Sequence, residues 1–545
     1  MPVIEVSKRD LCSLIGKNLN TNELSELLSF AKATLESESG DMLKIEAGDV
    51  NRPDLWSSEG IARIIKGQLG KEIGLPKYTA SKSNYILKVE SKVAKARPLI
   101  VCAVVKNLRL DEASINQIIQ LQEKLCENFG LKRKEAALGI YDFDRIKWPI
   151  TYTTFKPNEL KFVPLDMNGP LALNEILQKH EKGRQYSHLL ANCKEYPILI
   201  DAAKEVLSMP PIINSNLTGK VTEKTKNVFV EVTGFSYQFI VPVLNIMVSA
   251  LAERGGKIEQ VSIHGNNKIA TPDLSPKSFS AGIDYCNKII GLELNARQMC
   301  DLLKKARFDA KQDGNKIIAY YLPYRQDIMD ERDIIEDIAI AYGYDKLAPE
   351  EARIPTTGKA AGLMPIKKRI TEMLVGLNMQ EIATFTLTSR NNLSGRMHLE
   401  NGNAIEIANP ISENYSCIRN SLIPSVLEFL SQNTKKEFPQ KIFEIGECYD
   451  LKEEKTKDKL VVAITHSKVN FTEMKQILDY IMKNLNVKCG IKEVQHQSFI
   501  EGRAGSVIIN NAKAGIIGEI HPKVISSWNL EMPVSVLELD FDALH

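Results

Sequence analysis

The segment Tyr324–Tyr344, YRQDIMDERDIIEDIAIAYGY, combines a run of carboxylates with a helical pattern of isoleucines. Asp333, Glu336 and Asp337 stand at positions i, i+3 and i+4, and residues so spaced share one face of an α-helix. The isoleucines between them fall at the spacing of a face that packs against a core. The sequence therefore predicts a helix here with one acidic face and one buried face.

Asp327 precedes this predicted helix, in an extended run that leads into it. If the run folds back over the helix start, it adds a fourth carboxylate to the acidic face. Four carboxylates without a nearby His or Cys form an oxygen-only set, which suits Mg²⁺ or Ca²⁺ better than zinc. Alternatively, Asp330, Glu331 and Asp333 are first-turn acids that the helix dipole stabilises. On spacing alone the second interpretation is favoured, because acidic helix starts are common.

The longer motif PYRQDIMDERDIIEDIAIAYGYD resembles the magnesium-carrying module in the beta subunit of phenylalanyl-tRNA synthetase, in its archaeal and eukaryotic-cytosolic form. That family has an Arg-x-Asp, then Asp-(x2)-Glu-(Glu/Asp) and an Ala-Tyr-Gly-Tyr tail, and every spacing is kept here. The run NRPDLWSSEGIAR near the N-terminus resembles the same subunit. The resemblance implies Mg²⁺ as a cofactor. It implies as ligands of that ion Asp327, Asp333, Glu336 and Asp337.

Length and composition bound the classes of protein to which this chain can belong. With 545 residues the chain exceeds one hydrophobic core, and we expect ~3 to 5 domains. A content of 43% hydrophobic and 25% charged residues is that of a globular protein and excludes a fibrous or disordered one. The net charge of +2 is too small to indicate nucleic-acid binding, so any RNA contact requires a local basic patch.

The cysteines and the apolar runs indicate where the protein works. Nine cysteines are scattered without a CxxC pair, which argues against a disulfide framework or a structural zinc site and favours a reducing compartment. The N-terminus lacks the pattern of a signal peptide. The longest apolar run, Phe239–Ala252, is shorter than the ~20 residues that a membrane span needs. We therefore expect a cytoplasmic protein that does not contact a membrane.

The order of helical and strand-like patterns predicts a multidomain α+β protein with four modules. We expect a small mixed α/β module at residues 1–80 and a larger α/β module at 90–265. The acidic helix falls in a third module at 270–350, whose helices and short strands indicate a small winged-helix-like fold. The last module, at 355–545, is predicted to be an antiparallel sheet flanked by helices.

The second module carries motifs of a hydrolytic site. Its segments GIYDFD, YPILIDA, PPIINS and TKNVFVEVTG resemble the editing module of the same beta subunit. The resemblance implies a pocket that hydrolyses tyrosine mischarged onto the phenylalanine tRNA, with tRNA(Phe) as a partner. No His, Cys or metal cluster in these segments offers a strong base. The candidate residues of this pocket are Asn214, Ser215, Thr218 and Glu231.

The sequence places these candidates in a predicted strand and in a possible turn. In the predicted strand 227–233, alternation places Glu231 on the face opposite the valines, where it can enter a pocket. Asn214 and Ser215 follow Pro210–Pro211, and a capped turn explains them as well as a role in a pocket does. A nearby basic run, Lys132–Lys134, is better explained as a solvated helix end than as an RNA contact.

The last module resembles the catalytic-like domain of the beta subunit, whose fold is that of class II aminoacyl-tRNA synthetases. An adenylating member of that class needs an arginine for the γ-phosphate of ATP in a Gly-rich motif. No Gly-x-Gly-x-Gly-x-x-Arg occurs, and Arg503, in EGRAG, lacks the glycine pattern of that motif. The resemblance implies a non-adenylating subunit in an α2β2 tetramer. The alpha subunit then binds ATP and phenylalanine, and this chain adds editing, tRNA contacts and assembly.

Two functions other than that of a ligase subunit are compatible with parts of the sequence. The first is a stand-alone hydrolase that clears mischarged tRNA, and a surface for an alpha subunit on the last module speaks against it. The second is a Mg²⁺-dependent phosphoryl-transfer enzyme centred on Asp327 and Asp333. This second function is disfavoured because the chain contains no GxxxxGK[ST] phosphate loop.

Overall fold

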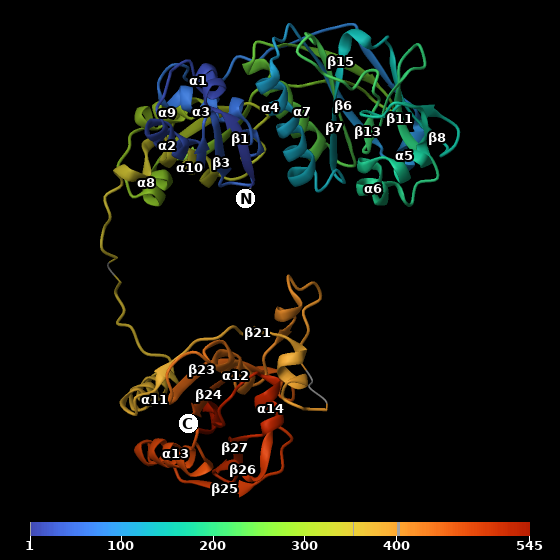
Figure 1. Cartoon of the computed structure of the whole chain (residues 1–545). Coiled ribbons are helices and arrows are strands. Elements are labelled where there is room, and N and C mark those ends of the chain that lie inside the picture. The colour runs from blue at the N-terminus through green and yellow to red at the C-terminus, as the bar shows by residue number, and fades with distance from the viewer. Residues whose placement is uncertain (1, 353, 401–403, 545) are drawn as a thin grey trace. The chain divides into compact units, whose positions relative to one another are not determined.

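The computed structural model describes residues 2–352, 354–400 and 404–544. The chain forms two compact units, residues 1–350 and 351–545 (Figure 1). Both units combine helices with sheets, so the predicted α+β class is confirmed at this level.

The chain begins with a small three-stranded antiparallel sheet in the order β1-β3-β2, backed by helices. Helix α2 starts at Asn20, whose side chain accepts a hydrogen bond from the backbone of Glu23 in a reciprocal capping box. The elements of this part are β1 Val3–Ser7, α1 Lys8–Ile15, α2 Thr21–Leu28, β2 Ala33–Ser39, β3 Met42–Ala47 and α3 Ser58–Gln68.

An eleven-stranded sheet follows, and its main path runs β13-β12-β11-β8-β5-β15-β6-β14-β7, with β4 and β16 paired to β15. Its strands are β4 Ala80–Ser81, β5 Ile86–Val89, β6 Leu99–Lys106, β7 Ala136–Asp142, β8 Ile150–Phe155, β11 Tyr196–Ile200, β12 Val206–Met209, β13 Ile213–Asn214, β14 Val228–Gly234, β15 Lys257–His264 and β16 Lys268–Thr271. The helices that accompany it are α4 Glu112–Lys124, α5 Leu173–Lys179, α6 Glu181–Tyr186 and α7 Tyr237–Glu253. A separate two-stranded ribbon is formed by β9 Lys161–Phe162 and β10 Leu171–Ala172.

This sheet is mixed, and the predicted α/β class of the module did not specify the direction of its strands. Strand β5 runs parallel to β8 and β15, and β4 is parallel to β15, but all other pairings are antiparallel. Periodicity in the sequence predicts strands but not their partners, and the difference between parallel and antiparallel pairing lies in the connections.

The two ends of the sheet approach one another. Strand β7 is one edge of the path and β13 is the other. The side-chain amide of Asn214, on β13, nevertheless donates to the carbonyl of Ile140 on β7 at 3.2 Å. Near the same place the hydroxyls of Tyr141 and Ser208 lie 2.8 Å apart. The sheet therefore curls until its edges nearly meet, and the candidate site lies at this seam.

A third group of elements completes the first unit, with a three-stranded antiparallel sheet in the order β17-β19-β18. Its elements are β17 Lys277–Gly282, α8 Ile283–Ile290, α9 Ala296–Lys305, β18 Asp309–Asp313, β19 Lys316–Tyr321 and α10 Glu331–Tyr342. Helix α10 is the predicted acidic helix, and its isoleucines are buried in the core of this group.

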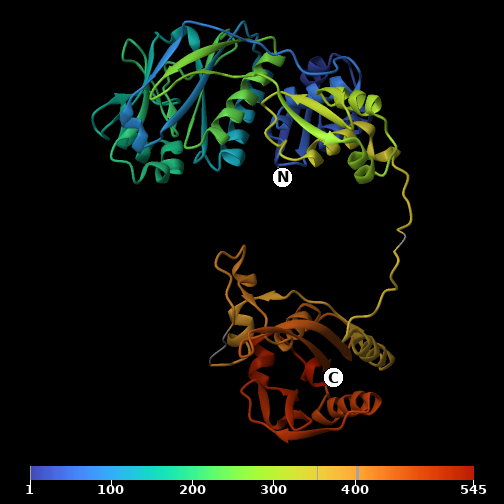
Figure 2. The ribbon, with the colours of Figure 1, turned by 180° about the vertical axis from the view of Figure 1, so that it is seen from behind.

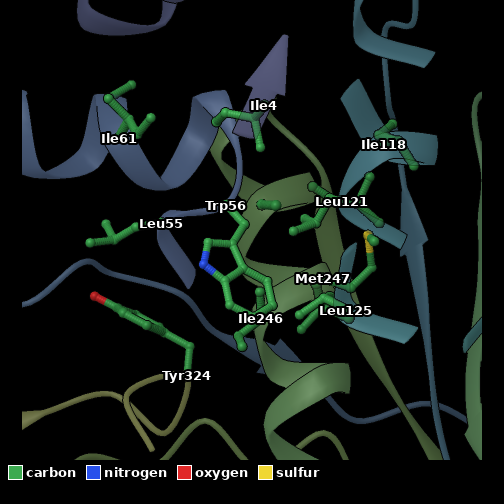
Figure 3. Packing of buried hydrophobic residues seen from close by; sticks show 14 of the residues in the cluster. Ile4, Leu55, Trp56, Ile61, Ile118, Leu121, Leu125, Ile246, Met247 and Tyr324 are labelled. Atoms are coloured by element: carbon green, nitrogen blue, oxygen red, sulfur yellow. The ribbon is translucent and has the colours of Figure 1, made fainter. Parts of the chain in front are cut away.

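One hydrophobic core joins the three parts of the first unit (Figure 3). Trp56, which is 1% exposed, lies at its centre. Around it are Ile4 from the small sheet, Leu121 from α4 and Met247 from α7. Tyr324, from the start of the acidic segment, belongs to the same cluster. Shared burial of this kind couples the three parts, because none of them exposes this surface to water.

The second unit contains a seven-stranded sheet in the order β20-β23-β24-β28-β27-β26-β25. Its strands are antiparallel throughout, except that β20 runs parallel to β23. Figure 2 shows this unit from behind, in orange and red. Helices α11 and α13 pack on one face and α12 and α14 on the other, so alternate residues of β24 enter two cores. Its elements are α11 Met364–Gly376, β20 Gln380–Glu381, β21 Leu387–Thr388, β22 Cys417–Ile418, α12 Ile423–Gln432, β23 Gln440–Asp450, β24 Lys455–Thr465, α13 Phe471–Leu485, β25 Cys489–Glu493, β26 Phe499–Ile509, β27 Ala512–Ile520, α14 Pro522–Ser527 and β28 Val534–Asp540.

Candidate functional site

A cavity of about 700 Å³ lies at the seam of the large sheet, between α4, β7 and the segment around Pro210–Pro211. Of the four residues predicted for an editing pocket, Glu231 and Asn214 line this cavity. Apolar side chains of Ile118, Leu138 and Ile140 form much of the wall near them. A volume of this size is typical of sites that enclose small organic ligands.

Glu231 is the unusual group in this cavity. It lies on β14 between β6 and β7 and is only 3% exposed. Its Oε1 accepts a hydrogen bond from the hydroxyl of Tyr141 at 2.9 Å, whereas its Oε2 has no hydrogen-bond partner among the residues described. Burial raises the pKa of Glu231 to about 8, although the Tyr141 hydrogen bond and the charge of Arg97 oppose this rise. At neutral pH the carboxyl is therefore mostly protonated.

A glycine opposite Glu231 leaves room for this carboxyl. Gly139 is the register partner of Glu231 on β7. A Cβ atom at Gly139 would lie 2.7 Å from Glu231 Oε1 and would also collide with the hydroxyl of Tyr141. Both polar groups therefore depend on the absence of a side chain at this position.

Ser215 and Thr218, the other two predicted residues, are buried beside the cavity but do not line it. Their hydroxyls lie 3.0 Å apart, and Ser215 Oγ accepts a hydrogen bond from the backbone of Thr218 at 3.3 Å. This is the geometry of a serine turn, so the capped-turn interpretation describes Ser215. Asn214 points to the cavity and also holds the seam through Ile140.

The sequence did not single out His180, which also lines the cavity. Its Nδ1 accepts a hydrogen bond from the backbone of Lys182 at 3.1 Å, and its Nε2 lies 3.1 Å from the carbonyl of Leu165. These contacts assign the proton to Nε2 and engage both ring nitrogens. His180 therefore supports the wall of the site and is not free to act as a general base.

Basic side chains at the rim of the cavity outnumber the acidic ones, Glu123, Asp166 and Glu181, and this excess favours an anionic ligand. The basic side chains that line the cavity include Lys179, Lys182, Arg184 and Lys220. Arg133 also lines it, but its guanidinium donates to the carbonyls of Pro211 and Ile212 at 3.2 and 2.8 Å. Arg133 thus links the segment that precedes β7 to the Pro210–Pro211 segment by hydrogen bonds. The prediction of a solvated helix end is wrong for Arg133, although Lys132 and Lys134 are exposed.

Of the four predicted metal ligands, only Asp327 and Asp337 come together. Arg325 Nη2 lies 2.6 Å from Asp327 Oδ2 and 2.7 Å from Asp337 Oδ2, and all three side chains are buried. Arg52 from the N-terminal part lies within 3.9 Å of both carboxylates. Burial by itself would raise the pKa of Asp327, but the neighbouring Arg325 charge and hydrogen bonds hold it below its usual range.

The other two predicted ligands have separate partners. Asp333 Oδ2 accepts hydrogen bonds from the backbone of Met329 and Asp330, both at 2.7 Å, and so caps the start of α10. This is the role of a first-turn acid. Glu336 Oε2 lies 2.8 Å from Lys32 Nζ, and the glutamate side chain is 43% exposed.

These four carboxylates, as arranged, do not fit a shared magnesium site. Within residues 2–352, 354–400 and 404–544 there is no group of three or more His, Cys, Asp and Glu that could hold a metal ion. The buried pair already has its charge balanced by arginines, which occupy the place of a cation. Magnesium bound through Asp327, Asp333, Glu336 and Asp337 stays a prediction.

Two arginines of the second unit, Arg419 and Arg503, make internal contacts. Arg419 is 3% exposed, and its Nη1 lies 2.8 Å from Glu444 Oε1 and 2.8 Å from Thr384 Oγ1. Arg503 Nη1 lies 2.8 Å from Glu519 Oε2 on the neighbouring strand. An arginine already paired with a carboxylate is a poor clamp for phosphate, because the two anions compete for the same donors.

Comparisons with known proteins agree along the whole chain. Family models match successive parts: the B3/4 domain at residues 83–260, the tRNA synthetase B5 domain at 279–344, and the phenylalanyl tRNA synthetase beta chain CLM domain at 351–541. No helix of the described chain is both long and apolar enough to span a membrane.

Curated relatives are similar over nearly their full length. The phenylalanine–tRNA ligase beta subunit of Pyrococcus horikoshii is 46% identical and covers 99% of each chain. The protein of the same name from Archaeoglobus fulgidus is 34% identical over 100% of this chain and 98% of its own. A crystal structure of an N-terminal fragment of the P. horikoshii phenylalanyl-tRNA synthetase beta subunit has 49% identity and a TM-score of 0.61, covering 63% of this chain and 100% of the fragment.

Proposed function

We propose the roles of this chain in its complex from the family to which it belongs, that of the phenylalanine–tRNA ligase beta subunit. The chain is accordingly a subunit of the complex that joins phenylalanine to its tRNA. Within that complex it edits mischarged tRNA at the cavity of the large sheet, contributes contacts to tRNA, and assembles with an alpha subunit.

The buried carboxyl of Glu231 carries the editing proposal. Phenylalanine and tyrosine differ by one hydroxyl, and an apolar synthetic site rejects an added hydroxyl by only ~100-fold. A second site that selects tyrosine needs a polar group in a largely apolar pocket. Glu231 is such a group: the residue lines the cavity, and its buried Oε2 has no hydrogen-bond partner among the described residues. The hydroxyl of a bound tyrosine forms a hydrogen bond with the Glu231 carboxyl, whereas phenylalanine leaves this carboxyl unpaired at a cost of about 1 to 3 kcal/mol.

The rest of the cavity suits an aminoacyl ester at the end of an RNA. The basic rim formed by Lys179, Lys182, Arg184 and Lys220 favours the phosphates of a 3′ end. Asn214 offers an amide for the ester or for the attacking water. Since His180 is fully engaged, hydrolysis relies on water placement and on the hydroxyls of the tRNA. The proposal includes no step through a metal ion.

Adenylation belongs to the alpha subunit in this proposal. The sequence contains no Gly-x-Gly-x-Gly-x-x-Arg motif, and Arg419 and Arg503 are paired with carboxylates. ATP and phenylalanine are therefore bound by the partner, in an α2β2 tetramer. The match of residues 351–541 to a domain of the ligase beta chain favours this assembly over a stand-alone hydrolase.

Deacylation of Tyr-tRNA(Phe) tests the editing proposal. We expect the complex with its alpha subunit to release tyrosine, and Glu231→Ala to slow the release at least tenfold. Glu123→Ala is the matched control, because Glu123 also lines the cavity but its side chain is 55% exposed and pairs with Lys182 at its rim. No release by the wild-type complex would refute editing, and equal rates in the two variants would remove Glu231 from the site. Release by the isolated chain at the rate of the complex would favour the stand-alone hydrolase.

A further inference from the structure

The hydroxyl of Tyr141 is bonded to the carboxyl of Glu231 but does not itself line the cavity. Tyr141 is fully buried on β7, and its ring packs against Phe229 with centroids 5.6 Å apart. Its hydroxyl lies 2.9 Å from Glu231 Oε1 and 2.8 Å from Ser208 Oγ. Nothing in the sequence singles out this residue, because it is one aromatic position of a buried strand.

The distances allow two proton arrangements in this short chain of hydrogen bonds, one in which Tyr141 donates to Glu231 and one in which it donates to Ser208. Burial and the neighbouring Glu231 raise the pKa of Tyr141 well above its usual value, so the phenol stays protonated. One phenolic proton serves one acceptor. If Tyr141 donates to Glu231 Oε1, Ser208 Oγ must donate to the Tyr141 oxygen. Glu231 Oε1 is then an acceptor, and a proton on the carboxyl resides on the other oxygen, Oε2.

We infer that Tyr141 is a positioning residue that turns the Glu231 carboxyl so that Oε2–H is the hydrogen-bond donor offered to a ligand. The ligand group that fits this donor is a neutral oxygen acceptor, and the phenolic oxygen of a tyrosyl ester has that chemistry. The inference rests on the proposed editing function. It adds that selection of tyrosine depends on a residue that never touches the substrate.

Neighbouring positions agree with this arrangement. Gly139 lies between the two side chains and leaves the space that their hydrogen bond needs, since a Cβ there would collide with both. Oε2 has no hydrogen-bond partner within the described part of the chain, so no other group competes for its proton. Without the Tyr141 hydroxyl, the carboxyl is free to rotate and to exchange the roles of its two oxygens.

The test compares selectivity and not activity alone. In the full complex, Tyr141→Phe should lower the ratio of kcat/KM for Tyr-tRNA(Phe) over Phe-tRNA(Phe) by about five- to tenfold, which corresponds to one hydrogen bond. Tyr152→Phe is the matched control, because it removes another fully buried hydroxyl of the same sheet, bonded to the carbonyl of Arg97 at 2.9 Å. The control should leave the ratio within twofold of wild type, since a general loss of stability slows both substrates alike.

A second variant keeps the inference falsifiable if Tyr141→Phe does not fold. Gly139→Ala crowds the same hydrogen bond from the opposite side and should lower the selectivity ratio in the same direction. A wild-type ratio in either folded variant overturns the role of Tyr141. Failure of the wild-type complex to release tyrosine at all refutes the proposed function instead, so the two failures are distinguishable.

Discussion

Replacing Glu231 by Gln should change how the stability of the protein depends on pH. Gln has nearly the same shape as Glu but does not titrate. Burial raises the pKa of Glu231 from 4.5 to about 8 in the folded state. Between these two values the folded state binds more protons than the unfolded state, so the free energy of unfolding falls as pH rises. The contribution of Glu231 is complete below pH 4.5 and is lost as pH rises through about 8.

The size of the effect follows from the same pKa values. Each pKa unit corresponds to about 1.36 kcal/mol, so the wild-type protein should lose about 2.5 to 3 kcal/mol from this group between pH 6 and pH 9. For a domain the size of residues 83–260, this loss of stability corresponds to a decrease of about 5 to 10 °C in melting temperature. Glu231→Gln removes it, and the variant should therefore gain stability relative to wild type as pH rises.

The assay is differential scanning calorimetry of both proteins at several pH values. Glu123→Gln is the control, because it makes the same substitution at an exposed carboxylate at the rim of the cavity. The measured quantity is the difference in the melting temperature of the transition that includes the large sheet. Parallel curves for wild type and Glu231→Gln from pH 6 to pH 9 would refute the raised pKa and with it the protonated carboxyl in the cavity.

Four further outcomes are expected. Arg325→Met leaves the carboxylates of Asp327 and Asp337 buried without their main partner and should cost about 3 to 5 kcal/mol of stability in urea unfolding. Asp333→Ala removes the acceptor for two backbone amides at the start of α10 and should cost about 1 kcal/mol by the same method, with an exposed-site Ala variant for comparison. Calorimetric titration with Mg²⁺ should show no bound ion if the arginine-paired arrangement is correct, whereas one ion per chain, weakened by Asp333→Asn, would establish the four-carboxylate site. The purified chain alone should show no phenylalanine-dependent exchange of pyrophosphate into ATP, and exchange should appear when the alpha subunit is added.

Local sequence patterns predicted several elements of the fold, and two of the four residues predicted for the pocket line the cavity. The isoleucine spacing of Ile334, Ile335 and Ile338 predicted the buried face of α10, since a helical period depends only on neighbours along the chain. Alternation in strand β14 likewise placed Glu231 opposite the valines, where the structure has it. Asn214 was found from its place after the Pro-Pro pair, although Ser215, with equal support from the sequence, belongs to a turn.

The partners of the carboxylates in the acidic segment could not be predicted from local sequence patterns. Their spacing predicted a common face, but it contained no information about the side chains opposite. Arg325 pairs with Asp327 and Asp337, Arg52 arrives from the N-terminal part of the chain, and Lys32 takes Glu336. A buried carboxylate must be paired, and whether the partner is an arginine or an ion depends on the residues that the fold brings there.

The sequence by itself determined the family, the helix and strand periods and the lack of an adenylation motif, because each is written in residues close together along the chain. Only the tertiary structure decided the cavity. Glu231, Tyr141 and Ser208 lie on three strands, and they meet because the sheet curls until β7 and β13 nearly touch. Curling depends on strand order and twist, which periodicity does not record. The contact between Tyr141 and Glu231 also needs the absence of a side chain at Gly139. Burial at that seam then raised the pKa of one carboxyl and left its second oxygen without a protein partner in the described structure.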